Sequence, residues 1–343
     1  MSPFRSIKGR ALGKLIEGFK SSDIGKGFGS GGGGGDVAAT GGNNISISPS
    51  GYKYHSFTSP GTFVCGSVSK VDILVVAGGG AGGSYYGGGG GAGGLIVWDN
   101  APLNDVTSLT IVVGDGGANS PGNNVNGATG GDSTVSGWNS TLFNPTVLIA
   151  KGGGGGTPAG QSPGGVGGSG GGRGSVPAPG PAGGAATQPT VNTQFTPLPA
   201  FSQFGNAGGS YPPSSTGYAG AGGGGAGAAG ANGFQSPGGG AGGDGQPVPQ
   251  FPGADIGPLV PVVPRMGPNG TYYAGGGSAG PYNGAVPNAA GHGGGGRGYS
   301  PDPSALQKGA DGLGGGGGGR HPTGASTATN GGKGIVIIRY DID

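Results

Sequence analysis

Unbroken blocks of glycine, such as Gly87–Gly91, Gly152–Gly156 and Gly314–Gly319, constrain the fold of this chain more than any other feature. Glycine is 98 of the 343 residues. Ordering a glycine costs more chain entropy than ordering any other residue, so a fold that keeps these blocks must gain something that only glycine permits. The gain we expect is direct packing of backbone against backbone. The composition therefore favours a structural role over an enzymatic one.

A disordered chain and a collagen triple helix can both be rich in glycine. Leu, Ile, Val and Phe total 59 residues, less than a fifth of the chain, as is typical of disordered proteins. A disordered chain also tends to carry a high net charge, whereas this one carries +2 and a single glutamate, Glu17. Collagen needs glycine at strict thirds, and here the glycines are consecutive. Both structures are therefore disfavoured.

The remaining structure is the glycine analogue of polyproline II, an extended left-handed helix with three residues per turn. Without side chains, such helices can lie side by side in either direction and hydrogen-bond to neighbours on every side, which satisfies their amides. We call the expected assembly a polyglycine II bundle. A seven-residue block would span about 22 Å in this conformation, long enough to build a compact body.

The first 51 residues differ from the rest. Over residues 4–20 apolar side chains recur at helical spacing opposite basic ones, which predicts one amphipathic α-helix. Residues 1–27 hold six Lys or Arg and two acidic residues, and residues 28–51 have the composition of a flexible linker. We therefore predict an N-terminal anchoring helix that is independent of the body. Its apolar face comprises Phe4, Ile7, Leu12, Leu15, Ile16 and Phe19.

Residues 52–343 are predicted to form one glycine-rich domain. Short runs of β-branched and aromatic residues bounded by glycine predict strands at His55–Thr58, Thr62–Cys65, Val71–Ala77, Gly94–Asp99, Thr107–Val113, Asp132–Val135, Val147–Lys151 and Gly334–Asp341. Residues 152–333 hold almost no strand signal, so the bundle is expected as an insertion there. The apolar run of the last strand predicts a central place in a sheet, buried on both faces.

Three passages follow one another in a fixed order: Val71–Gly80, then Leu109–Gly114 with Gly130–Ser133, then Gly334–Tyr340. Together they resemble the glycine-rich domain of bacteriophage tail-fibre and virion structural proteins, over roughly residues 52–343. Their strand order is also similar to the tumour-necrosis-factor-like jelly roll with inserted glycine helices. The implied fold class is mostly β and irregular: a small antiparallel jelly-roll-like sheet with an inserted polyglycine II bundle and one N-terminal amphipathic α-helix.

The resemblance implies a structural virion protein, either a tail fibre or a receptor-binding fibre tip, often a homotrimer. Residues 4–20 are similar to the anchors of marine podovirus fibres and would bind a tail adaptor or nozzle protein, although such a helix can also lie on anionic lipid. The chain would be assembled in the host cytoplasm and act on the virion at the host surface. Its target there would be an envelope polysaccharide or an outer-membrane protein.

Two further functions stay open. The first is a head decoration, spike or nozzle fibre without a receptor role. The second is an ice-binding protein, because flat bundles of such helices can order water. The bulky aromatic residues between the glycine blocks disfavour the second.

Aromatic residues in these intervening segments are the candidate recognition sites. Beside Ser, Asn and Pro they offer stacking faces at low entropic cost, which suits contact with a sugar or a protein loop. The alternative is that each ring caps an end of the bundle, so rings at the far tip are expected to be functional and rings beside the sheet structural. The pairs Tyr85-Tyr86 and Trp138-Asn139 and the residue Tyr299 also belong to this class. The receptor-binding candidates are Phe195, Phe201, Phe204, Tyr211, Tyr218, Phe251, Tyr272, Tyr273 and Tyr282.

Catalytic, cofactor and metal sites are not expected, nor is a nucleic acid partner. The chain has three histidines and one glutamate, so clustered acids and bases are scarce, although a glycosidase with two aspartates stays open. The single cysteine, Cys65, excludes an internal disulfide and predicts a packed thiol.

Isolated basic residues lie inside or beside the glycine blocks. We interpret them as cations that keep the surface soluble, with binding of anionic lipopolysaccharide as the alternative. They are Arg173, Arg297 and Arg320, together with His292 and His321.

Overall fold

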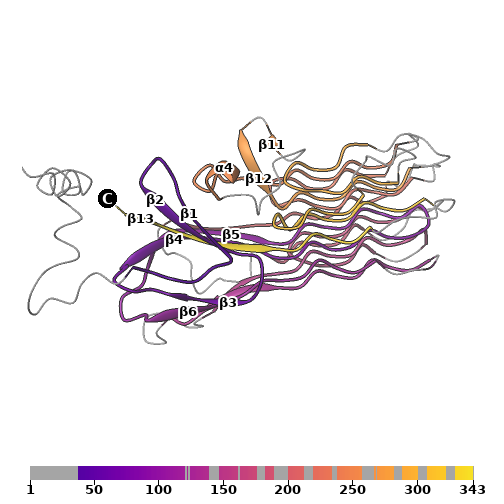
Figure 1. Ribbon diagram of the computed structural model, residues 1–343. Helices are drawn as coiled ribbons and strands as arrows, with labels where there is room; N and C mark the ends of the chain where they lie inside the picture. Colours follow the sequence, from indigo (N-terminus) through magenta and orange to yellow (C-terminus); the bar gives the residue numbers. More distant parts are fainter. Residues whose placement is uncertain are drawn as a thin grey trace, which may run out of the picture.

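The computed structural model describes residues 38–119, 122, 124–138, 147–160, 163–175, 182–188, 200–211, 219–233, 238–256, 266–267, 269–281, 288–299, 307–321 and 329–342. Figure 1 shows two parts placed end to end: β-sheets at one end, and extended segments that run side by side away from them. The anchoring helix predicted over residues 4–20 lies outside the described residues.

The larger sheet has six antiparallel strands. Their order is β1 (Asn44–Ile47), β2 (Tyr52–Phe57), β13 (Ile335–Asp341), β4 (Lys70–Val76), β5 (Leu95–Pro102) and β9 (Phe201–Phe204). The last strand of the chain therefore lies between β2 and β4, as its apolar run predicted. The strand β9 was not predicted, because its four residues carry little strand signal between glycine-rich segments.

The second sheet has four antiparallel strands, and a third is much smaller. The second consists of β3 (Gly61–Val64), β6 (Ser108–Val112), β7 (Ser133–Ser136) and β8 (Val147–Ala150). The third consists of β10 (Gln246–Pro247), β12 (Gly270–Tyr273) and β11 (Met266–Gly267), and the short helix α4 (Gly253–Ile256) lies between β10 and β11 in the chain. The expected fold class is confirmed at this level, as a mostly β structure of antiparallel sheets.

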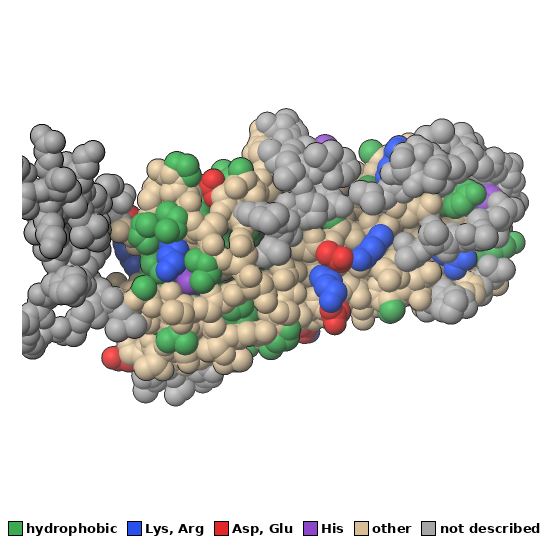
Figure 2. Space-filling view, viewed as in Figure 1, with side chains coloured by type: hydrophobic (Ala, Val, Ile, Leu, Met, Phe, Trp, Pro, Cys, Tyr) green, Lys and Arg blue, Asp and Glu red, His purple; other side chains and the backbone are tan. Residues whose placement is uncertain are grey.

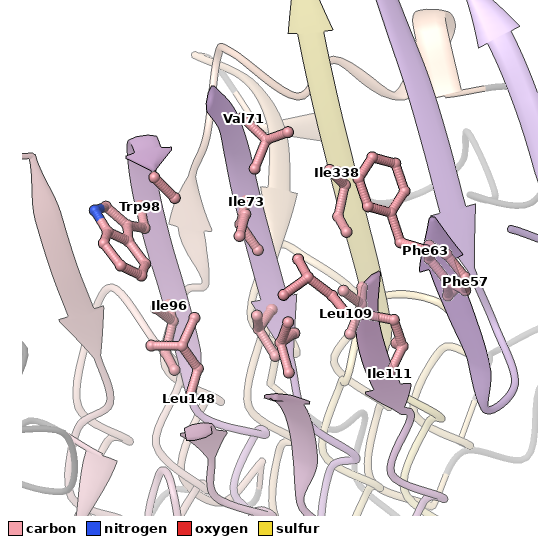
Figure 3. Packing of buried hydrophobic residues seen from close by; sticks show 14 of the residues in the cluster. Phe57, Phe63, Val71, Ile73, Ile96, Trp98, Leu109, Ile111, Leu148 and Ile338 are labelled. Atoms are coloured by element: carbon pink, nitrogen blue, oxygen red, sulfur yellow. The ribbon is translucent and has the colours of Figure 1, made fainter. Parts of the chain in front are cut away.

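An apolar core joins the two larger sheets, and we call the pair the sandwich. Figure 3 shows Ile73 and Ile338 of the larger sheet in the same cluster as Leu109 and Ile111 of the second. All four side chains are fully buried. Period-two alternation places these residues on the inner faces, and their burial is the main apolar stabilisation of this end.

The outer face of the larger sheet is covered as well. Alternate residues of β13, such as Ile335 and Ile337, belong to a second core cluster with Phe251, Tyr273 and Leu313. The strand is apolar at successive positions because both of its faces are buried, as predicted from the sequence.

The extended segments, which we call the glycine rods, are linked by backbone hydrogen bonds with a three-residue repeat. Each amide of residues 78–83 donates to a neighbouring rod, and amides three residues apart donate to the same rod. The bonds, between 2.8 and 3.0 Å long, run from Gly78 to Gly131, Gly79 to Gly332, Gly80 to Gly91, Ala81 to Ala128, Gly82 to Thr329 and Gly83 to Gly88. Three residues per turn is the repeat expected for polyglycine II.

The rod of residues 87–94 lies inside the bundle. Among the described residues it bonds to six other segments, donating to three and accepting from three. It donates to residues 151–157, 221–224 and 314–320, and it accepts from residues 77–83, 169–172 and 277–280. Peptide groups therefore link the bundle in every lateral direction, and the buried amides are satisfied without side chains.

Lack of space, and not the backbone angle, requires glycine in the two rods of residues 78–94. No glycine of residues 78–94 has a φ in the left-handed region. A Cβ atom added to Gly90 would lie 2.1 Å from the carbonyl oxygen of Gly80, and one added to Gly316 would lie 2.0 Å from that of Gly90. Any side chain at these positions would force the rods apart.

Two predicted boundaries differ from the structure. The bundle is not confined to residues 152–333, because the rods 77–94 and 113–131 belong to it as well. Residues 38–51 do not form a flexible linker: Thr40 pairs with Val64, and β1 is the edge strand of the larger sheet. Linker composition hid this short strand, whose Asn and Ser side chains bond to the backbone at α4.

Candidate functional site

The end of the bundle away from the sandwich, which we call the distal end, contains the turns where rods reverse direction. The rod 78–83 leaves β4 and the rod 87–94 returns to β5, so Ser84–Tyr86 form a turn at this end. Backbone bonds hold neighbouring segments there, from Ala159 to the carbonyl of Tyr85, Ser175 to that of Tyr86 and Arg320 to that of Gly83. Backbone hydrogen bonds from three neighbouring segments therefore hold the turn in place.

Both tyrosines of this turn have strained backbones. Tyr85 and Tyr86 each have a φ of 51°, in the left-handed region that Gly and Asn occupy readily. A bulky residue there costs about 1–3 kcal/mol, and such strain is concentrated at functional sites. Two consecutive tyrosines in a turn that Asn-Gly would fit without strain indicate that the rings themselves are needed.

The two rings belong to a chain of ring contacts that we call the distal aromatic cluster: Tyr85, Tyr86, His321 and Tyr299. Tyr85 meets Tyr86 edge to face with centroids 5.2 Å apart, and Tyr86 meets His321 in the same way at 5.2 Å. Tyr299 stacks on His321 at 5.6 Å. Burial lowers the pKa of His321, so its ring is neutral at neutral pH.

Part of this cluster faces solvent. Tyr85 is 37% exposed, whereas His321 is buried. On the face seen in Figure 2, apolar and histidine side chains appear at the distal end, and acidic ones appear only over the sandwich and the bases of the rods. Rigid phenol rings with a polar tip suit contacts to a sugar face or a protein loop.

Most of the receptor-binding candidates named above lie elsewhere. Phe251 and Tyr273 are fully buried and Tyr272 nearly so, at the base of the bundle beside the larger sheet. Phe201 and Phe204 are on β9, where Phe201 packs edge to face against Trp98 at 5.9 Å. All five rings lie beside the sheets, where a structural role was expected; Phe251, Tyr272 and Tyr273 are buried, and the two on β9 are half-buried.

The other candidates divide between the distal end and the undescribed parts of the chain. Tyr211 ends a rod at the distal end and is buried beside Gly233. Phe195, Tyr218 and Tyr282 lie outside the described residues. Tyr85, Tyr86 and Tyr299 were predicted among the aromatic residues between the glycine blocks, whereas His321 was interpreted as a solubilising cation, or alternatively as part of a lipopolysaccharide site. No spacing could show its contact with Tyr299, because the path of the rods brings them together.

A polar cavity of about 350 Å³ lies at the opposite end of the molecule, lined by Tyr52, Asp72, Asp99 and Arg339 among others. The side chain of Arg339 pairs with Asp72 at 2.9 Å and lies 4.2 Å from the centre of the Tyr52 ring. Asp72 also accepts the Asn100 amide at 2.8 Å. Burial raises the pKa of Asp99. Because Arg339 already engages Asp72, the cavity is better explained as a structural ion-pair network than as a pair of catalytic carboxylates.

No group of three or more His, Cys, Asp or Glu side chains in the described part of the chain is arranged to hold a metal ion. None of the described helices is long and apolar enough to cross a membrane.

Comparison with curated proteins gave no match. A family model described as a glycine-rich domain matches residues 56–341, which is most of the chain and includes both larger sheets apart from β1 and the first strand residues of β2. The match therefore spans the strands and the rods together, as one unit. The chain belongs to this glycine-rich domain family.

Proposed function

We propose that the protein is a structural component of a phage virion, a tail fibre or fibre tip that binds the host surface through the distal end of its bundle. The observation that carries this proposal is the strained Tyr85-Tyr86 turn, which the rods hold at the end opposite the first and last described residues. Ala38 and Ile342 line one groove at the sandwich end, so the first and last described residues lie together, far from that turn.

This arrangement suits a projecting fibre element. In the proposal, residues 4–20 bind a tail adaptor or nozzle protein on the virion side. The rods then hold the distal aromatic cluster away from the particle, toward a polysaccharide or an outer-membrane protein of the host. The same proposal includes a homotrimer, a jelly-roll origin of the sandwich and assembly in the host cytoplasm. These three parts rest on the resemblance described above.

Competition for adsorption tests the proposal. Purified protein should block adsorption of the phage that carries it, and the variant Tyr85→Asn should block much less, because the ring is lost while the backbone conformation is eased. Ile47→Asn is the matched control: it changes an exposed apolar side chain, 64% exposed, at the sandwich end and should block like the unmodified protein.

The same assay separates a receptor-binding fibre from a decoration or nozzle fibre. A protein without a receptor role would leave adsorption unchanged at saturating concentration, and that result would refute host binding. Electron microscopy of virions that lack the protein tests the structural role by itself. Unaltered particles would refute it.

A further inference from the structure

Charges are sorted along the length of the molecule. The described ion pairs of Lys151, Lys308, Lys333 and Arg339, with Asp132, Asp311, Asp115 and Asp72 respectively, all lie in the sandwich or at the bases of the rods. Within the described ranges no Asp or Glu lies at the distal end. Arg173 and Arg320, in contrast, lie there.

Arg173 is completely buried, which contradicts its interpretation as a cation that keeps the surface soluble. Its backbone is fixed in the bundle: the amide donates to Gly209 at 3.3 Å, and the carbonyl accepts from Ala221 at 2.7 Å. Its Nη2 donates to the carbonyl oxygen of Gly160 at 3.2 Å. Nε and Nη1 have no hydrogen-bond partner among the described residues, although both are buried.

A guanidinium in this position needs a negative partner. Arginine stays protonated in proteins, even though burial lowers the pKa of this one. A buried charge without a counter-charge is strongly unfavourable, and a water molecule could accept a hydrogen bond but could not neutralise the charge. The described part of the distal end supplies no carboxylate. None of the described side chains can therefore be the negative partner of Arg173.

We infer that Arg173 is the centre of an anion-binding site at the distal end, which takes a compact oxyanion of the phosphate or sulfate class. Oxyanions accept charge-assisted hydrogen bonds from several donors at once, and Nε and Nη1 are two such donors. Tyr211 follows two residues after Gly209, which accepts the Arg173 amide, and its phenol is a further donor on the neighbouring rod. The inference does not rest on the proposed host-binding function.

Thermal unfolding in titrated salts tests the site. The unfolding temperature is measured in a chloride-free zwitterionic buffer to which inorganic phosphate or sulfate is added. The control is a salt of a bulky organic anion at the same ionic strength. The unmodified protein should show a saturable rise. In Arg173→Met the rise should disappear or need about 30-fold more anion, since losing one partner of a buried charge pair costs at least that much affinity. Lys308→Met, which removes an exposed charge at a rod base, should respond like the unmodified protein.

The response of the unmodified protein tests the inference even if Arg173→Met fails to fold. No saturable response of that protein to phosphate or sulfate would overturn the inference, and so would an equal response in a folded Arg173→Met. Adding glucose 1-phosphate identifies the source of the oxyanion. Saturation by inorganic ions alone indicates an enclosed resident ion, whereas saturation by the sugar phosphate as well indicates a site for the terminal phosphate of a glycan.

Discussion

Two consecutive glycines of one rod, Gly130 and Gly131, should respond very differently to alanine. A Cβ atom added to Gly130 would lie 2.1 Å from the carbonyl oxygen of Gly78, about 1.3 Å short of an ordinary contact at 3.4 Å. The carbonyl of Gly78 also accepts the Gly153 amide, and Gly130 itself donates to Gly153, so moving the rods apart weakens bonds to a third segment. A Cβ atom added to Gly131 would lie 3.0 Å from its nearest neighbour.

The expected free energies differ accordingly. Overpacking costs about 1–3 kcal/mol, and each of two disturbed hydrogen bonds adds roughly 1 kcal/mol, so Gly130→Ala should lower the free energy of unfolding by about 3–5 kcal/mol. For Gly131→Ala a smaller clash is offset by about 0.4–1 kcal/mol from the less flexible unfolded chain, so the net change should stay within about 1 kcal/mol. Urea unfolding of both variants measures this difference. Equal losses of stability would refute the idea that close contact between backbones requires glycine.

Three further outcomes follow from the described contacts. Tyr85→Asn should raise the free energy of unfolding by up to about 1 kcal/mol, because Asn adopts a positive φ with less strain, and a loss of stability in thermal unfolding would contradict the strain argument. Burial lowers the pKa of His55, whose Nδ1 lies 2.6 Å from the Gly41 carbonyl oxygen, so the folded state prefers the neutral ring. Stability should therefore be complete above pH 6.5, the ordinary value, and fall as the pH decreases through the lower pKa of the folded state; His55→Gln should flatten that fall in a pH series of unfolding curves. Burial raises the pKa of Cys65 to about 11, so the native thiol should resist a disulfide reagent at pH 8 and react on denaturation, and rapid native reaction would contradict its packing.

The sequence predicted those elements whose type depends only on the local pattern of residues. The runs that became β4, β6 and β13 combine β-branched residues with glycine boundaries, and their type does not depend on distant partners. The double burial of β13 could also be predicted, since an uninterrupted apolar strand needs two covered faces. Local pattern also predicted β2 and β3 as strands, but it could not show that the short link between them carries the chain from one sheet to the other.

The assembly of the rods and the candidate site could be predicted less well. Which rod lies beside which depends on backbone contacts between residues as distant as Gly79 and Gly332, and identical glycines carry no information about register. The same limit applies to the site. Composition indicated aromatic segments, but only the path of the rods places Tyr299 on His321 and leaves Phe251 in the core.

The central claim is that the glycine tracts are ordered rods joined through their peptide groups. Hydrogen exchange of residues 78–94 in the purified protein tests it most directly, because these two rods donate amides to neighbours along most of their length. We expect protection comparable to that of β4 and β13 in the sandwich, with faster exchange confined to the turn at Ser84–Tyr86. Exchange of the whole stretch at the rate of an unstructured peptide, while β4 and β13 stay protected, would contradict the account.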